Sequence, residues 1–470
     1  MAVWAFIVLE GARRGVEVAS ITLGDTPVTR LTTGGGGPAV VVAHGFAGSR
    51  QIMQGYSFFL ARAGYDVYAF DFEGHGMHPV PMSGDVSSIE GTTRKLVNQT
   101  RAVIDLAAQG GTPVALLGHS MATDILVRAA EDDARIGPLV LISAFSAAID
   151  AAHPRDALFV TGAWEPGLAD FAVDAARMVD PAAAPGQTVT EGGVSRRAVI
   201  VPLADHVAIL HARAARAEAL AWLNRFYART PASEPPQTGW ALLALLAAIT
   251  ALARPLARLL PTRVTTPPSL TRAQIVAVLL VPGVAAPLLA APFDLAFLPV
   301  LVADYLALHL LIYGAVHLGL LLWFGARPGW PAPFAAALLL VWGLAVFGLV
   351  LDRYGANFWP VSPRVPIISA LVVGAVPFMM ADALAAYCAP IWRRVLQRIV
   401  FLASLGAAVA LDFEGLFFLF MIAPVIVLFW LTFGLMGRAF AQRAGPATAG
   451  LPLGVILAWA LGVTFPLFTI

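Results

Sequence analysis

Eight long apolar stretches in the second half of the sequence limit most strongly what this chain can fold into. A helix needs about 20 apolar residues to cross the hydrocarbon core of a bilayer. Inside a bilayer every backbone polar group must be satisfied internally, so apolar stretches of this length predict helices rather than loops or open sheets. The stretches cover residues 239–257, 273–291, 298–324, 333–351, 366–388, 395–411, 415–436 and 450–469. The sequence therefore predicts an all-α transmembrane bundle of seven or eight helices.

Composition indicates that only part of the chain belongs in a membrane. Charged residues make up 13% of the 470 residues, whereas soluble domains contain about 25%. Charges are dense up to about residue 235 and become sparse beyond it. A polar, proline-rich stretch at 228–238 has the composition of an interdomain linker. We predict four parts: an N-terminal segment with the first strands at 1–37, a globular domain at 38–230, the linker at 231–238, and the helical domain at 239–470.

Several classes of protein are excluded by charge and by cysteine content. The net charge of +1 leaves no basic patch for nucleic-acid binding. The single cysteine, Cys388, excludes an intrachain disulfide framework. The glycine run at 34–37 lacks the Lys-Ser/Thr that follows a phosphate-binding loop. The first half also lacks His and Cys at metal-ligand spacing, so we expect neither a cofactor nor a metal.

Before the linker, short apolar runs alternate with amphipathic helical patterns. This alternation is typical of a parallel sheet covered by helices. Strands are predicted at Ala39–Ala43, Asp66–Phe70, 114–117, 138–143, 158–161 and 198–201, and helices at 51–63, 89–108, Met121–Ala130 and 208–227. The predicted fold class of the first half is therefore α/β.

The strand at 114–117 runs directly into Gly118-His119-Ser120, after which a helix is predicted. Small residues at Gly118 and Ala122 can accommodate a strained turn that projects the serine hydroxyl above the sheet edge. The free N–H groups at the start of the helix favour negative charge at the same place. Ser120 is therefore the predicted nucleophile.

A serine nucleophile needs a base and an acid that orients the base. His206 follows the last predicted strand, where its ring can reach back over Ser120. Glu165, just beyond the preceding strand, is the predicted acid. Asp150 and Asp170 are the reserve candidates, while Asp205 lies next to the histidine and is expected to point elsewhere.

Three motifs stand at the ends of the predicted strands: H-G-F-A-G-S at 44–49, D-F-E-G-H-G at 71–76 and G-H-S-M-A at 118–122. Their order and spacing resemble the α/β-hydrolase family, particularly its lipase, esterase and serine aminopeptidase-like branch. The resemblance covers residues 38–230, somewhat under half of the chain. It implies an oxyanion hole formed by the backbone N–H groups of Phe46 and Met121. Ala122 and Thr123 stand where this family often has glycine, which puts the packing beneath the serine in question.

The chain order of nucleophile, acid and base is that of α/β-hydrolases. His44, His75 and His119 are expected to brace loops rather than to catalyse. The connection between 143 and 158 has room for only a short loop, where many lipases insert a helical lid. We therefore expect an open catalytic mouth, unless the membrane domain or the loop at 72–89 covers it.

These features together predict a membrane-integral serine hydrolase. Its expected substrate is a lipid-like or apolar ester, whose acyl group is cleaved or transferred through an acyl-enzyme. Membrane lipids are the other expected partners, and the oligomeric state is left open. The alternatives are a transporter or ligand-sensing membrane protein with an accessory hydrolase domain, and an interaction module that has lost activity.

Arginines are unevenly divided between the loops of the helical domain. Ten lie in alternate loops and two, Arg353 and Arg364, in the opposite loops. Positive loops stay in the cytoplasm, so a spanning first segment places the hydrolase domain outside it, at a bacterial-type inner membrane. An exported domain needs an anchor, and residues 1–9 are too short to span. We expect a truncated anchor helix before Arg13; otherwise the segment 239–257 does not cross.

A polar stripe lies within the third apolar segment. Tyr305, His309, Tyr313 and His317 recur every four residues, with Asp304 beside them. A fifth segment contains Asp382. Hydrogen bonds between helices are the expected role, and a lipid-headgroup, metal or proton site is the alternative.

Overall fold

The computed structural model describes residues 1–470 except 86–88, 231–233, 264–267, 294, 296 and 470. The predicted linker at 231–238 therefore lies partly outside the described residues. The chain divides into two compact units. The first comprises Met1–Leu245 with Asp352–Asn357, and the second comprises Leu246–Leu351 with Phe358–Ile470.

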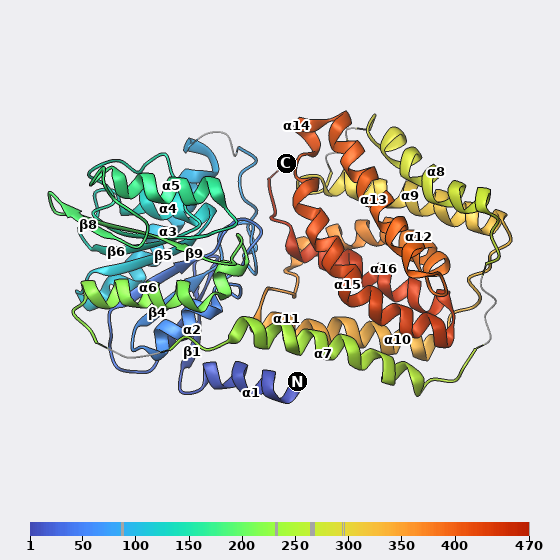
Figure 1. The fold of residues 1–470 in the computed structure, drawn as a ribbon, viewed down its shortest axis with the longest axis horizontal. Coiled ribbons are helices and arrows are strands. Elements are labelled where there is room, and N and C mark those ends of the chain that lie inside the picture. Colours follow the sequence, from blue (N-terminus) through green and yellow to red (C-terminus); the bar gives the residue numbers. More distant parts are fainter. Residues whose placement is uncertain (86–88, 231–233, 264–267, 294, 296, 470) are drawn as a thin grey trace. The chain divides into compact units, whose positions relative to one another are not determined.

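The first unit is built on a nine-stranded, mostly parallel sheet (Figure 1). Its strands are β1 (Glu17–Leu23), β2 (Thr26–Thr32), β3 (Ala39–Ala43), β4 (Asp66–Phe70), β5 (Val114–His119), β6 (Ile136–Ile142), β7 (Asp156–Gly162), β8 (Thr188–Glu191) and β9 (Val194–Val201). Their spatial order is β1-β2-β4-β3-β5-β6-β7-β9-β8. The strands from β4 to β9 in this order run parallel, and β1, β2 and β8 add antiparallel edges. The predicted α/β fold class is confirmed.

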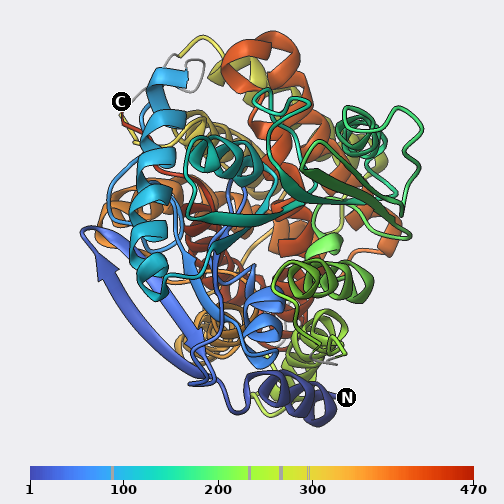
Figure 2. The same ribbon diagram turned by 90° about the vertical axis from the view of Figure 1, so that its left-hand side faces the viewer.

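Helices cover both faces of this sheet (Figures 1 and 2). One face carries α2 (Gln54–Arg62) and α6 (Arg213–Phe226), and the other carries α3 (Arg94–Ala107), α4 (Met121–Ala130) and α5 (Pro166–Arg177). The short elements α1 (Ala2–Arg13), η1 (Ile89–Thr93), η2 (Ala108–Gly110) and η3 (Ala208–His211) complete the unit. Because both faces are covered, the central strands are apolar along their whole length and β3 and β5 are almost entirely buried.

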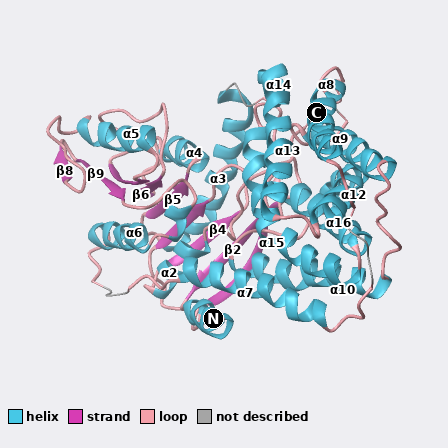
Figure 3. Cartoon of the chain, turned by 45° about the vertical axis from the view of Figure 1, so that its right-hand side comes forward, coloured by secondary structure: helices cyan, strands magenta, loops and turns pink. Residues whose placement is uncertain are grey.

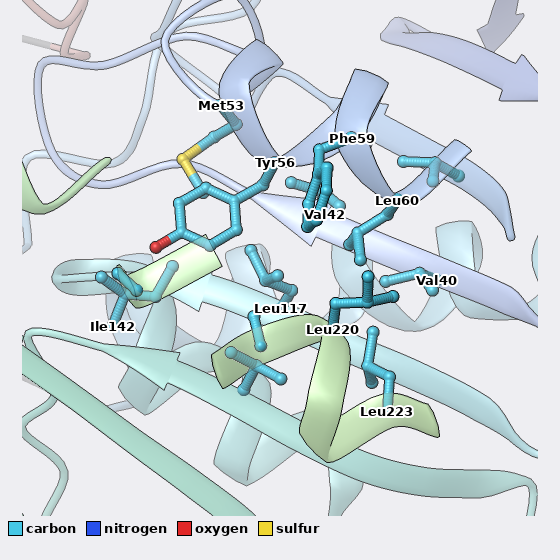
Figure 4. Packing of buried hydrophobic residues seen from close by; sticks show 14 of the residues in the cluster. Val40, Val42, Met53, Tyr56, Phe59, Leu60, Leu117, Ile142, Leu220 and Leu223 are labelled. Atoms are coloured by element: carbon cyan, nitrogen blue, oxygen red, sulfur yellow. The ribbon is translucent and has the colours of Figure 1, made fainter. Parts of the chain in front are cut away.

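The main core lies between the sheet and the helices α2 and α6 (Figure 4). Tyr56 and Leu60 of α2 and Leu220 of α6 pack onto Val42 and Leu117 of the central strands. This packing holds β3 and β5 rigidly at the centre of the sheet. The ends of these two strands consequently have well-defined positions.

Two elements of the first unit were missing from the sequence prediction. The helix α5 follows β7, and the hairpin strand β8 precedes β9. Three of the four residues of β8 are exposed, so this edge strand lacks the apolar run from which the other strands were predicted. The other strands and helices for which a range was predicted lie within a few residues of that range.

In the second unit, every labelled element is a helix (Figure 3). The helices of this unit are α7 (Thr238–Arg258, which begins in the first unit), α8 (Arg272–Ala290), α9 (Ala303–Trp323), α10 (Pro333–Val341), η4 (Trp342–Phe347), α11 (Gly348–Tyr354, which ends in the first unit), η5 (Ser362–Arg364), α12 (Val365–Ala386), α13 (Ile391–Leu411), α14 (Phe413–Leu416), α15 (Leu419–Ala444) and α16 (Pro446–Thr464). The elements α10, η4 and α11 form one continuous helix. Among the described residues, eight helices are long and apolar enough to cross a membrane, as the sequence predicted.

Glycines let the central helix α12 approach its neighbours α9 and α16 closely. A Cβ added to Gly374 of α12 would lie 2.3 Å from the carbonyl oxygen of Ala307 in α9. A Cβ added to Gly454 of α16 would lie 2.5 Å from the Cα of Val376 in α12. Small residues at helix contacts are the usual device for packing in membranes, where apolar side chains gain little from leaving lipid.

This packing predicts that Gly454→Ala lowers the melting temperature of the detergent-solubilised protein. Overpacking of this kind costs about 1–3 kcal/mol. Gly406→Ala is the matched control, because an added Cβ there meets no atom within 4 Å, and alanine favours a helix over glycine by about 0.5–1 kcal/mol. Equal melting temperatures for the two variants would contradict the close packing of α12 and α16.

Candidate active site

Ser120 occupies a strained turn between β5 and α4. Its backbone has φ 55° and ψ −121°, in a region that L-residues rarely adopt. The Ser120 N–H donates to the carbonyl oxygen of Ile142 at 2.9 Å, which ties the turn to β6. The turn thus presents the serine hydroxyl at the carboxyl edge of the sheet, as the sequence predicted.

Small neighbours make this turn possible. A Cβ added to Gly118 would lie 2.5 Å from Leu126 Cδ1 and 3.1 Å from the methyl group of Ala122. A Cβ added to Gly45 would lie 3.0 Å from Ser120 Cβ. The alanine at 122 is fully buried, and its methyl group is accommodated because Gly118 has no side chain.

Thr123 is the second residue that stands where α/β-hydrolases often have glycine, and its hydroxyl stabilises the serine turn. Its Oγ1 donates to the carbonyl oxygen of Ser120 at 2.7 Å. The Thr123 Oγ1 in turn accepts the N–H of Phe145 at 3.2 Å. The threonine therefore connects the loop after β6 to the turn that carries the serine.

His206 lies between Ser120 and Glu165. Its Nε2 is 2.9 Å from Ser120 Oγ, and its Nδ1 is 2.5 Å from Glu165 Oε1. Asp205 points elsewhere, because its Oδ1 accepts the N–H groups of Val207 and Ala208. The three predicted site residues come from the loops after β5, β7 and β9, and His206 is within hydrogen-bond distance of each of the other two.

Glu165 is held as a carboxylate. Burial raises its pKa, but hydrogen bonds from His206, Ser143 and Gly162 together lower the pKa below its ordinary value. Ser143 Oγ donates to Oε2 at 2.8 Å, and the Gly162 N–H donates to the same oxygen at 3.1 Å. A charged Glu165 accepts a hydrogen bond from Nδ1–H of His206, which keeps the proton on Nδ1 and leaves Nε2 free to accept the proton of Ser120.

The two reserve acids are engaged elsewhere or exposed. Asp150 Oδ1 accepts the N–H groups of Ala152 and His153 in the loop after β6. Asp170 is an exposed residue of α5. The geometry therefore favours Glu165 as the partner of His206.

His119 braces the loop that carries the proposed base. Its Nε2–H donates to the carbonyl oxygen of His206 at 2.8 Å. Burial, with the nearby His206 as a smaller cause, lowers the pKa of His119 to about 3. The ring is therefore neutral at pH 7 and places no second positive charge beside His206 when that residue takes up a proton.

His44 and Asp71 join the loops after β3 and β4. His44 Nδ1–H donates to the carbonyl oxygen of Gly45 at 2.8 Å, and its Nε2 accepts the Phe72 N–H at 3.1 Å. Asp71 accepts the Arg50 N–H at 2.7 Å and forms an ion pair with the Arg50 side chain. These contacts fix the loop that contains Phe46.

The two predicted oxyanion-hole donors flank the serine. Met121 follows Ser120 as the first residue of α4. Phe46 follows Gly45, whose Cα lies against Ser120. Both residues are thus next to Ser120 or next to a residue that contacts it, and their role as oxyanion-hole donors stays a prediction.

Sequence reasoning missed Ser143 and Gly162, the two groups besides His206 that donate to Glu165. Ser143 is a fully buried polar residue directly after the apolar strand β6, with φ 49°. A polar residue at the carboxyl end of a buried strand was the available signal, since ligands of α/β sheets bind at that edge. The loop at 143–155, which the structure describes throughout, contains no helix.

Comparison with known families agrees with the predicted resemblance to α/β-hydrolases. Residues 37–173 match the family described as "Serine aminopeptidase, S33". The matched range contains the three motifs, Ser120 and Glu165, and it ends before His206. The first unit contains an α/β-hydrolase domain.

Solved structures similar to this chain come from several sources. TT1662 from Thermus thermophilus is 16% identical, with 45% of this chain and 98% of that chain covered and a TM-score of 0.34. A putative lipase from Acinetobacter baumannii is 15% identical over 48% of this chain and 97% of that one, with a TM-score of 0.33. A hormone-sensitive lipase from a metagenome library is 17% identical over 48% and 92%, with a TM-score of 0.34. No curated protein matches the chain.

Outside the hydrolase domain, two residues of the polar stripe, Tyr305 and His309, make hydrogen bonds within α9 and to α13. Tyr305 Oη lies 3.2 Å from Nδ1 of His309, and Nε2 of His309 lies 3.2 Å from Ser404 Oγ. Among the described residues, no three His, Cys, Asp or Glu side chains are grouped so that they could hold a metal ion. The contacts of His309 agree with hydrogen bonding between helices.

Loss of the Ser143 hydroxyl should raise the pKa of Glu165 and weaken the orientation of His206. We expect Ser143→Ala to lower kcat/KM about tenfold, the effect of losing one hydrogen bond to a charged group. The acid limb of the pH–rate profile should also move to higher pH, because more of Glu165 is then protonated. Ser146→Ala is the matched control, since its hydroxyl donates to Asp124. Identical pH profiles for both variants would show that Ser143 does not act through Glu165.

Proposed function

We propose that this protein is a membrane-integral serine hydrolase that cleaves or transfers acyl groups of lipid-like or apolar esters. The observation that carries the proposal is the hydrogen-bonded series Ser120, His206 and Glu165 at the carboxyl edge of the sheet. A serine placed in a strained turn and hydrogen-bonded to an oriented histidine is suited to nucleophilic attack.

In the proposed reaction, Ser120 Oγ attacks the ester carbonyl carbon while His206 Nε2 takes its proton. The backbone N–H groups of Phe46 and Met121 stabilise the negative charge on the carbonyl oxygen, a contribution of several kcal/mol in comparable sites. The protonated His206 then gives its proton to the departing alcohol, which leaves an acyl group on Ser120. Water or an acceptor alcohol, deprotonated by His206, attacks the acyl-enzyme and regenerates the serine. Glu165 keeps its charge throughout and stabilises the imidazolium.

Exposed apolar side chains near these residues support an apolar substrate. Phe145 follows β6, Trp164 precedes Glu165, and Leu203 and Val207 flank His206 in the loop after β9. Their exposed fractions are 46%, 63%, 79% and 53%. We call these four residues the apolar rim. Exposed apolar groups clustered at one edge mark an interaction site more often than scattered ones do, and an acyl chain would cover them.

The eight long apolar helices support a location in a membrane. The arginine distribution favours a hydrolase domain outside the cytoplasm, at a bacterial-type inner membrane. An enzyme held at the bilayer meets substrates that partition into it, which agrees with the apolar rim.

The proposal predicts the labelling pattern of a fluorophosphonate probe on the purified full-length protein in detergent. Wild type should be labelled, Ser120→Ala should lose labelling, and His206→Ala should react at least about a hundredfold more slowly, since removal of a general base costs about 10²–10⁴-fold. Ser146→Ala should react like wild type. Folded wild-type protein that is not labelled would contradict catalysis by Ser120 and would favour an inactive hydrolase domain with its function in the helices.

The apolar rim predicts a dependence on acyl-chain length. Leu203→Asn and Trp164→Gln should lower kcat/KM for p-nitrophenyl decanoate several-fold and leave the value for the acetate nearly unchanged, because only the longer chain reaches the rim. Burial of a CH₂ group is worth about 0.8 kcal/mol. Met178→Gln is the control, an exposed apolar residue at the end of α5. Equal losses on both esters would show that the rim does not bind the acyl chain.

A further inference from the structure

A pocket within the second unit collects three arginines and one aspartate. It lies among α12, α13, α15 and α16, and its charged lining residues are Asp382, Arg394, Arg398 and Arg438. The lining carries a surplus of two positive charges. Arginines at helix ends are ordinary at the cytoplasmic side of a membrane, but these side chains line a common pocket with a nearly buried carboxylate.

Protein groups hold part of this cluster in place. Arg398 Nη2 lies 3.9 Å from Asp382 Oδ2, and its guanidinium stands 5.3 Å from the centre of the Trp430 ring. Asp382 Oδ1 accepts a hydrogen bond from Gln397 at 2.9 Å. A Cβ added to Gly434 would lie 3.3 Å from Arg398 Nη2, so this glycine of α15 leaves room for the guanidinium.

The same cluster has hydrogen-bond donors that the protein leaves unused. Within the described part of the chain, Nε of Arg394 and Nε of Arg398 are buried and have no hydrogen-bond partner. A buried polar group without a partner costs about 1–3 kcal/mol, and more when it is charged. Mutual repulsion of the three guanidinium groups adds to this cost. Both costs are removed by an anion that accepts from the arginines.

We propose that this pocket binds a phosphate-type anion through Arg394, Arg398 and Arg438. The planar guanidinium fork matches the oxygens of a phosphate group and can donate to two of them. Asp382 positions Arg398 and limits the positive charge of the pocket. Basic pockets between transmembrane helices bind lipid headgroups, and the same chemistry would accept free phosphate. The site is separate from the proposed serine hydrolase chemistry and does not depend on it.

The test is the ligand-induced rise in melting temperature of the full-length protein in detergent. One arm adds phosphatidylglycerol to the micelles, with phosphatidylcholine as the zwitterionic comparison. The other adds inorganic phosphate, with sodium chloride at matched ionic strength. The double variant Arg394→Gln/Arg438→Gln removes two of the guanidinium groups. Arg272→Gln is the control, an exposed arginine at the start of α8.

Phosphatidylglycerol should raise the melting temperature of wild type and of Arg272→Gln in a saturable manner. The double variant should need at least about tenfold more lipid for half of the rise, since charged hydrogen bonds are lost. A specific response to inorganic phosphate that is lost in the double variant would support the site with the free anion as its source. The same response in wild type and double variant, or no response to either anion, would overturn the proposal.

Asp382→Asn should change the affinity of the pocket for the anion in the opposite direction. Removing the carboxylate leaves a surplus of three positive charges, so the variant should bind the anion more tightly than wild type. This variant tests the anion site if the double variant does not fold. Tighter binding of the anion supports the site, and unchanged or weaker binding overturns it.

Discussion

The left-handed backbone of Ser120 is the constraint on which the geometry of the candidate site depends. Such a conformation costs about 1–3 kcal/mol and persists only where the surroundings enforce it. Here the enforcement comes from a fully buried strand before the serine, a helix after it, and a hydrogen bond to Ile142 in the neighbouring strand. Glycines at 45 and 118 give the backbone segments the space to meet. The backbone conformation of this turn therefore restricts the Ser120 side chain to a direction out of the sheet.

Charge is distributed around His206 so that its protonated form can be stabilised. Glu165 is ionised because three donors outweigh the cost of its burial. His119, on the other side, is neutral because burial lowers its pKa. The ring of His206 therefore has a fixed negative charge on one side and an uncharged donor to its backbone on the other. This arrangement favours movement of a proton from Ser120 to Nε2 when an oxyanion forms.

The helical unit is stabilised by interactions other than those of the first unit. Its helices gain little from burying apolar side chains, because lipid is equally apolar. Close approach through glycines and hydrogen bonds such as that between His309 and Ser404 take over the role of the apolar core. Buried charge is expensive in this environment. The cluster of Arg394, Arg398, Arg438 and Asp382 therefore carries a cost that a bound anion would lower.

Features that are encoded by neighbouring residues could be predicted from the amino-acid sequence. The length and apolarity of each segment predict a spanning helix, and the run from β5 through Gly118 to α4 predicts the serine turn, because both patterns are local. The fold class followed from the alternation of such segments. The edge strand β8 was missed because most of its residues are exposed and its pattern is weak.

The contacts between polar groups that are distant in the sequence depend on how the elements pack in three dimensions. Strand positions alone favoured Glu165 over the other carboxylates as the partner of His206. The distance between Glu165 and His206 depends on how β7 and β9 pair. Ser143 reaches Glu165 from the end of a different strand, and the arginines of the pocket come from two helices. The residues that form such hydrogen bonds and ion pairs follow no periodic pattern in the sequence from which the contacts could be predicted. They form only after burial of the apolar faces has brought the strands and helices together.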